Sequence, residues 1–304
     1  GQVSLEGTED LTGKTVVIGI DGGRLRTRRR KRGRRKAKQK RQGFYTDWKE
    51  PKLFTIYLLD SDGEVVRGFP PLHDATMGDH HQALALLEQY LSALPLADAQ
   101  RIVFCGDGAP WIWSGITALC QRMHLDMTHV HQVLDYTHAK QQLDILLGYV
   151  PKGKRMTEKL DPKWLTTLWQ GEIDTLKTEI ERVCTGSRLR SALNKWTSYF
   201  DENRDRMQYQ AFQDAAIPCG SGCVESAIRR VINLRLKAPG SFWTLPMAEA
   251  FLFLRSQLLS GRWAIMMRNI VQQGARFLRH MHEDSPAFEA FQPPHRGLQP
   301  HALA

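Results

Sequence analysis

The sequence lacks a hydrophobic run long enough to cross a membrane. Its longest apolar stretch covers residues 248–259 and is interrupted by Glu249 and Arg255. A membrane-spanning helix needs roughly 20 apolar residues, so this stretch is too short. No secretory signal is visible either. We therefore expect a soluble protein with no membrane partner.

Cysteines are few and follow no disulfide pattern. The chain has five, and an odd, irregularly spaced set is typical of a reducing compartment. Cys219 and Cys223 lie four residues apart, but no second pair matches them, which argues against a structural zinc site. We expect a cytoplasmic protein without disulfides.

Acidic residues are absent from residues 24–41. This segment holds thirteen of the 42 basic residues, and the remaining 29 are offset by all 32 acidic residues, so it accounts for the net charge of +10. Because like charges repel unless a polyanion neutralises them, we expect a flexible loop that contacts nucleic acid. The alternative is a solvated segment that only aids solubility. The candidate DNA contacts here are Arg24, Arg26, Arg28, Arg29, Arg30, Lys31, Arg32, Arg34, Arg35 and Lys36.

Length and patterning define the expected elements. With 304 residues, 42% of them hydrophobic, the chain is long enough for one large domain or two smaller ones. Because it begins with glycine, we expect a fragment of a longer protein or a trimmed chain. Apolar runs predict strands at 14–20, 52–59, 64–69, 101–105 and 127–134, with 52–59 and 64–69 paired as a hairpin. Helical spacing predicts helices at 80–94, 110–123, from 138 onward, 223–237, 246–260 and 263–281.

These elements suggest four parts. Residues 1–14 are a lead-in, 15–141 and 216–262 form an α/β core, 142–215 form an all-α insertion, and 263–304 are a C-terminal helix and tail. The helix at 246–260 is apolar on most faces, so we expect it to pack into the core.

Three acids stand at the ends of these elements. Asp21 and Asp107 each follow a buried-type strand and precede a glycine, and Glu225 lies in the first turn of a helix after Gly220-Ser221-Gly222. Ligands bind at the carboxyl ends of strands in open α/β sheets, and Mg²⁺ prefers carboxylate oxygens. If the three acids meet, they can hold a metal pair. Singly, each has a plain structural role, since Asp-Gly favours turns and glutamate suits a helix start.

The chain resembles a known family over residues 15–260. The segments that carry the resemblance include Gly-Asp-Gly-Ala-Pro-Trp-Ile at 106–112 and Gly-Ser-Gly-x-x-Glu at 220–225, and the others lie at 18–22, 134–139, 235–237 and 240–243. They resemble the RNase H-like DDE transposases of bacterial insertion sequences, in the retroviral-integrase superfamily. The resemblance implies an α/β fold, an RNase H-like mixed five-stranded sheet flanked by helices, with the all-α insertion domain before the last catalytic helix.

The resemblance also implies a mechanism. Asp21, Asp107 and Glu225 would be both the catalytic acids and the ligands of two Mg²⁺ or Mn²⁺ ions, for DNA strand cleavage and strand transfer. The partners would be transposon ends and target DNA, bound by a homodimer in the bacterial, nucleoid-associated cytoplasm. The alternatives are an RNase H-like nuclease without strand transfer and a non-catalytic DNA-binding relative.

Other residues have two open interpretations. Asp135 and His138 orient a phosphate or a metal-bound water, or else Asp135 caps a helix and His138 is an ordinary polar residue. Trp111 and Trp243 stack on bases or belong to the core, and Trp113 has the same two interpretations. Arg235 and Lys237 face DNA phosphates or only solvent. His129 and His131 alternate on one strand face, where a hydrogen-bonded pair is favoured over a metal pair.

Overall fold

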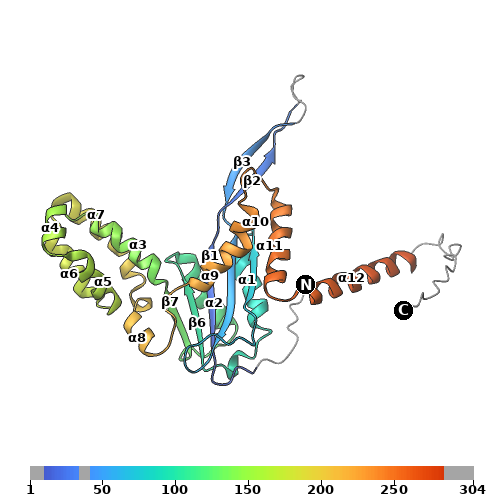
Figure 1. The fold of residues 1–304 in the computed structure, drawn as a ribbon, viewed down its shortest axis with the longest axis horizontal. Helices are drawn as coiled ribbons and strands as arrows, with labels where there is room; N and C mark the ends of the chain where they lie inside the picture. The colour runs from blue at the N-terminus through green and yellow to red at the C-terminus, as the bar shows by residue number, and fades with distance from the viewer. Residues whose placement is uncertain (1–9, 34–41, 284–304) are drawn as a thin grey trace, which may run out of the picture. The chain divides into compact units, whose positions relative to one another are not determined.

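The structure is a computed structural model that describes residues 10–33 and 42–283, the side chains of 274–283 excepted (Figure 1). The chain divides into two units, residues 1–260 and 261–304. The second unit contains helix α12 (Trp263–Glu283), which exposes Trp263, Met267, Ile270 and Val271. Within the described residues, no helix combines the length and the apolar character that crossing a membrane requires.

The first unit is built on a five-stranded mixed sheet, in the order β5-β4-β1-β6-β7. The strands are β1 (Thr15–Gly22), β4 (Lys52–Leu59), β5 (Leu72–Thr76), β6 (Arg101–Gly106) and β7 (Val130–Leu134). β1, β6 and β7 are parallel, whereas β4 is antiparallel to both β1 and β5. The protein is therefore an α/β protein with a five-stranded mixed sheet, as predicted.

Alternation along β1 assigns the two faces of the sheet. Val16, Ile18 and Ile20 share a core with α1 (His80–Leu91) and α2 (Pro110–Arg122). Gly19 points to the opposite face, against Val224. That face is covered by α9 (Gly222–Ile228), η4 (Arg229–Asn233), α10 (Leu234–Leu236) and α11 (Leu245–Leu259), where η denotes a 3-10 or π turn. The short turn η1 (Leu96–Asp98) precedes β6.

Residues 142–215, all of which the structure describes, contain helices and no strand. Their core continues that of the sheet, because Trp164, Leu168 and Trp196 belong to the same buried cluster as Ile18 and Phe104. The predicted insertion therefore does not have a hydrophobic core of its own. The elements from β7 onward are α3 (Tyr136–Leu147), α4 (Lys152–Thr157), α5 (Leu160–Trp169), α6 (Ile173–Val183), α7 (Gly186–Trp196), η2 (Thr197–Asp201), η3 (Arg204–Arg206) and α8 (Tyr209–Asp214).

The prediction of a returning strand at 64–69 was wrong. Val65 makes only an isolated bridge to Leu59, and the partner of β4 is β5, a few residues later. β5 is buried although it carries His73 and Asp74. The Tyr90 hydroxyl donates to the Asp74 carboxylate at 2.7 Å, and the backbone N–H of His73 donates to the Ser260 hydroxyl at 2.8 Å. These partners come from α1 and the end of α11, so apolar patterning did not reveal the strand.

The prediction of a flexible loop at 24–41 was wrong for the first part of that segment. Residues 25–30 form β2 (Leu25–Arg30), which pairs antiparallel with β3 (Phe44–Lys49) as a separate two-stranded sheet. We call this sheet the arm. Figure 1 shows the arm continuing from β1 beyond the end of the main sheet. Residues 34–41, with Arg34, Arg35 and Lys36, lie outside the described residues.

The helix predicted to pack into the core does so along one face. α11 buries Ala248, Leu252, Ser256 and Gln257, which pack toward β5. Its other faces expose Leu245, Met247, Phe253 and Leu258. The helix therefore packs into the core along one face, although its composition is apolar on most faces.

Candidate active site

Three aspartates form one row across the sheet. Gly19 pairs with Cys105, and Cys105 pairs with Val133. Asp21 lies two residues beyond Gly19 in β1, and Asp107 and Asp135 are the first residues after β6 and β7. Strand alternation places Asp21 on the face that α9 covers. Asp135 accepts a hydrogen bond from the start of α9, and the charge of Asp107 acts on Asp21. The row therefore lies at the carboxyl ends of β1, β6 and β7, and Asp135 joins it as a member that sequence patterning did not place there.

Asp21 is half-buried, and its Oδ1 accepts a hydrogen bond from the Gly22 N–H at 2.6 Å. Burial is the main cause that raises the pKa of Asp21 to about 6. The negative charges of Asp107 and Glu225 raise this pKa further, and the Gly22 N–H and His138 oppose the rise. The three predicted acids are therefore close enough to interact electrostatically.

Asp107 sits beside a residue from the helical segment. Its Oδ1 accepts from the Ala109 N–H at 2.9 Å, which shapes the turn into α2. A Cβ on the next residue, Gly108, would lie 2.2 Å from the Tyr199 ring, so only glycine fits there. Burial, with Asp107 and Asp135 adding to it, raises the pKa of Tyr199, and its buried hydroxyl has no hydrogen-bond partner within the described ranges. Sequence reasoning missed Tyr199, since nothing near residue 199 indicates a site.

Glu225 reaches this region because its helix packs directly on β1. A Cβ on Gly19 would lie 2.9 Å from the Val224 Cβ, so the absent side chain lets α9 approach the strand. The Glu225 side chain is exposed. Among the residues that the structure describes, no three His, Cys, Asp or Glu side chains converge closely enough to hold a metal ion. The carboxylate oxygens of the three acids are ligands that suit Mg²⁺ or Mn²⁺. In their present positions, however, the three side chains do not surround a common metal site.

Asp135 fixes the starts of two helices. Its Oδ1 accepts from the His138 N–H at 3.0 Å as the N-cap of α3, and its Oδ2 accepts from the Ser221 N–H at the start of α9. Burial raises the pKa of Asp135, but the hydrogen bonds from His138 and Ser221 outweigh burial and hold it well below its usual value. Asp135 thus has the helix-capping role that was one of its two predicted interpretations, and it also ties the glutamate helix to β7.

His138 extends this cluster. Its Nδ1 lies 3.5 Å from Asp135 Oδ1. The contact with the Asp135 carboxylate is the main cause that raises the pKa of His138, and the charges of Asp21 and Asp107 add to it. The imidazole therefore lies within the electrostatic field of the aspartate row. Its predicted role toward a phosphate or a water stays a prediction.

Asp135→Asn is expected to lower the free energy of unfolding by about 1–3 kcal/mol, because an amide cannot accept from both N–H groups and leaves one buried donor unpaired. Urea unfolding would measure this. Asp79→Asn is the matched control, since Asp79 also caps a helix, accepting from the Gln82 N–H at 2.9 Å, but ties no second helix. Equal losses in the two variants would contradict the bridging role of Asp135.

The predicted aromatic contacts divide in the structure. Trp113 is buried, 4% exposed, so it belongs to the core. Trp111 is half-buried, and Lys52 Nζ lies 5.5 Å from its ring centroid. Trp243 donates its indole N–H to the Leu236 carbonyl at 2.9 Å and packs on Phe251. It therefore has a structural role at the end of α10. DNA contacts by Trp111 and Trp243 stay predictions.

Of the basic candidates, Arg235 and Lys237 are exposed, and Arg24, Arg28, Arg29, Arg30, Lys31 and Arg32 are exposed on or beside the arm. Arg26 is half-buried. The exposed side chains are therefore accessible to a polyanion, and their contact with DNA stays a prediction.

His129 and His131 do not form a metal pair with a third ligand in the described part of the chain. His129 lies before β7, and its Nδ1 is 3.0 Å from the Gln100 carbonyl oxygen. Burial lowers the pKa of His131, and Arg101 adds to this. No described contact bonds the two histidines to each other, although the charge of His129 also lowers the pKa of His131.

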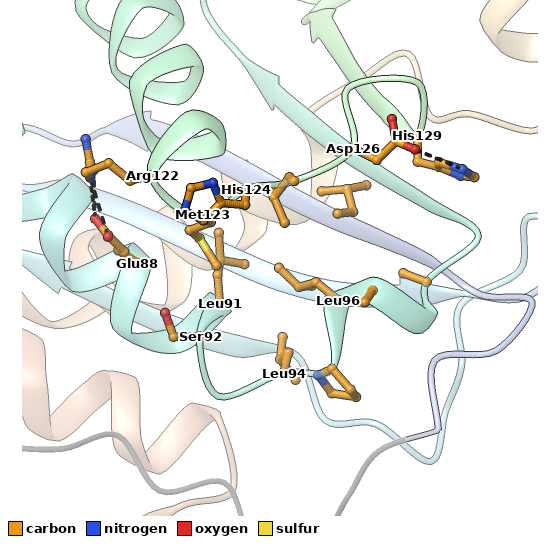
Figure 2. Close-up of a pocket in the computed structure, with 15 residues that line it drawn as sticks. Glu88, Leu91, Ser92, Leu94, Leu96, Arg122, Met123, His124, Asp126 and His129 are labelled. Atoms are coloured by element: carbon orange, nitrogen blue, oxygen red, sulfur yellow. Dashed lines mark hydrogen bonds and ion pairs between the residues drawn. The ribbon is translucent and has the colours of Figure 1, made fainter.

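A pocket of about 640 Å³ lies at the other end of the sheet (Figure 2). Its lining includes Leu91, Leu96, Ile102, Arg122 and His129. Ile102 begins β6 and His129 precedes β7, so the pocket is near the amino ends of these strands and away from the aspartate row. Figure 2 shows the Glu88–Arg122 ion pair at its edge, at 2.7 Å. The pocket contains no residue of the candidate active site.

Comparisons with known proteins gave no match. No family model matches the chain, and neither a curated protein nor a solved structure does.

Proposed function

We propose that this chain is the catalytic core of a DDE transposase with an RNase H-like fold. The observation that carries the proposal is the meeting of three acid-bearing elements. β1 and β6 present Asp21 and Asp107 side by side, and Val224 packs on Gly19 to bring Glu225 to the same end of the sheet. The sequence resemblance assigns catalysis to these same three acids.

Asp21, Asp107 and Glu225 are the residues that would hold two Mg²⁺ or Mn²⁺ ions. Such ions stabilise the attacking and leaving oxygens of a phosphoryl transfer. Glu225 is exposed, and its side chain would have to turn toward the two aspartates to join the set. Asp135 has both oxygens engaged by N–H groups, so it positions the helices, and His138 beside it faces the same anionic region.

The reaction consists of two phosphoryl transfers. In cleavage, a water oxygen attacks a DNA phosphorus, the bond to the 3′ oxygen breaks, and a 3′-hydroxyl is released. In strand transfer, that 3′-hydroxyl attacks a phosphorus of target DNA, and a target 3′ oxygen leaves. No protein side chain becomes covalently bound. Catalysis is then mainly positioning and charge neutralisation.

The test is an assay of both steps with Mg²⁺ or Mn²⁺. Supercoiled plasmid reports nicking, and a labelled oligonucleotide with a free 3′-hydroxyl reports joining to that plasmid. Joined products support a transposase, whereas nicking without joining indicates the nuclease. Binding without cleavage under both metals indicates a non-catalytic relative. Action as a homodimer on paired ends stays a prediction.

Asp21→Asn is expected to stabilise the metal-free protein. Well below pH 3.8 the Asp21 carboxyl is protonated in both the folded and the unfolded state. Between pH 3.8 and about 6 the unfolded chain has lost this proton while the folded protein still holds it. Stability therefore falls across this window and stays lower above it. Removing the charge should raise the free energy of unfolding at neutral pH by about 1–2 kcal/mol, given partial exposure.

Urea unfolding across this pH window would measure the effect. Millimolar Mn²⁺ should raise the melting temperature of the wild type more than that of Asp21→Asn, because the amide no longer supplies a charged ligand. A variant that is no more stable than wild type at neutral pH would contradict the repulsive environment of Asp21.

A further inference from the structure

The arm presents charge and aromatic rings on an exposed surface. Arg28, Arg29 and Arg30 are exposed on β2, and Phe44, Tyr45 and Trp48 on β3 are 40%, 55% and 50% exposed. A two-stranded sheet is marginally stable in water by itself. Repulsion between the like charges of this surface destabilises the arm unless a bound partner neutralises them. A partner that neutralises positive charge is a polyanion.

Cations lie over each of the exposed rings. Arg24 and Arg26 are both 5.4 Å from the Trp48 ring centroid, Arg28 is 5.8 Å from that of Phe44, and Lys31 is 4.9 Å from that of Tyr45. Cation–π contact holds side chains that would otherwise repel one another. Because cations cover the rings, the arm presents positive charge more than open stacking faces. This favours the phosphates of a duplex over unstacked bases, which need free ring faces.

The base of the arm is fixed to the catalytic elements. The Gly23 N–H donates to the Pro51 carbonyl at 2.9 Å, and a Cβ on Gly23 would lie 2.6 Å from Ile232 Cδ1 in η4, which directly follows α9. Trp243 exchanges backbone hydrogen bonds with the arm, its carbonyl accepting from Arg28 at 2.8 Å and its N–H donating to the Arg26 carbonyl at 3.1 Å. The arm is therefore held by the same elements that position Asp21 and Glu225.

We propose that the arm is a β-ribbon that lies in a groove of duplex DNA and holds it in line with the candidate active site. The inference rests on the proposed function for the identity of the partner as DNA. A two-stranded ribbon fits the major groove. Arg30 is nine residues beyond Asp21, so at roughly 3.3 Å per residue the arm reaches at most about 30 Å, the length of about nine base pairs.

The experiment measures binding of the full chain to a duplex and to a matching single strand by fluorescence anisotropy, over a range of salt concentrations. All variants carry Asp107→Asn, so that cleavage does not interfere. Arg28→Ala with Arg30→Ala removes two exposed charges from the arm. The matched control is Arg188→Ala with Arg190→Ala, which removes two exposed charges from α7. Circular dichroism checks that each variant is folded.

The arm variant should bind the duplex about tenfold more weakly than the control, and its salt slope should fall by about 1.8, or about 0.9 per lost phosphate contact. Binding within twofold of the control would overturn the proposal. Preferential loss of single-strand binding would also overturn it. As a second measurement, a photo-crosslinker in place of the exposed Tyr45 should crosslink to the duplex, and absence of crosslinks would count against the arm.

The two proposals can fail separately. If the unmodified chain never cuts DNA but the arm variant loses duplex binding, the proposed function fails and the arm proposal stands. If the unmodified chain cuts and joins DNA while the arm variant binds like its control, the arm proposal fails and the proposed function stands.

Discussion

Asp107→Asn is expected to reduce metal-dependent DNA cleavage by about 10³-fold or more, at or beyond the upper end of what loss of one electrostatic group costs. The asparagine keeps an oxygen that can accept from the Ala109 N–H, so the turn into α2 should persist. What it loses is the charge on which a metal ligand depends. Nicking of supercoiled plasmid would measure the loss, and DNA affinity should stay within about twofold because the exposed basic residues are unchanged.

Asp126→Asn is the matched control for this variant. Asp126 makes the same kind of local bond, its Oδ1 accepting from the Thr128 N–H at 2.9 Å, but it lines the pocket away from the aspartate row. It should cleave like the wild type. Wild-type cleavage by Asp107→Asn would reject the assignment of Asp107 and the proposed mechanism with it.

Gly19→Ala is expected to impair cleavage without altering any acid. Its new Cβ would lie 2.9 Å from the Val224 Cβ and 3.2 Å from Thr55 Cγ2. Both neighbours are buried, so α9 must shift away from β1. Overpacking of this kind costs about 1–3 kcal/mol of stability. A displacement of the order of 1 Å at Glu225 would lower the cleavage rate about 10²-fold.

Thermal unfolding and the nicking assay, run below the unfolding transition, separate the two effects. Gly68→Ala is the control, because no atom lies within 4 Å of its added Cβ. Combining Gly19→Ala with Val224→Gly removes the clashing carbon and should recover part of the lost activity, despite the cost of about 1 kcal/mol for glycine in a helix. If Gly19→Ala cleaves like Gly68→Ala, close packing of α9 on β1 does not position Glu225.

Buried polar contacts and charge account for the errors of the sequence analysis. The arm was predicted to be a flexible loop because its basic residues repel one another. The aromatic rings over which those cations lie belong to β3, and the backbone of the arm is hydrogen-bonded to Trp243. β5 was missed because His73 and Asp74 are polar. The Asp74 carboxylate is bonded by Tyr90 of α1, and the His73 backbone by Ser260 at the end of α11. In each case the stabilising partner is distant in the chain.

The sequence by itself determined the strands that end at Asp21 and Asp107 and the helix that carries Glu225, because apolar periodicity and glycine-rich turns are local properties of the chain. Only the tertiary structure decided that Asp135 joins the same row, that Val224 packs on Gly19, and that Tyr199 lies against Gly108. The physical reason is that strand register and helix packing depend on contacts between residues far apart in sequence. Local patterns predict which elements form, and these long-range contacts decide which side chains meet.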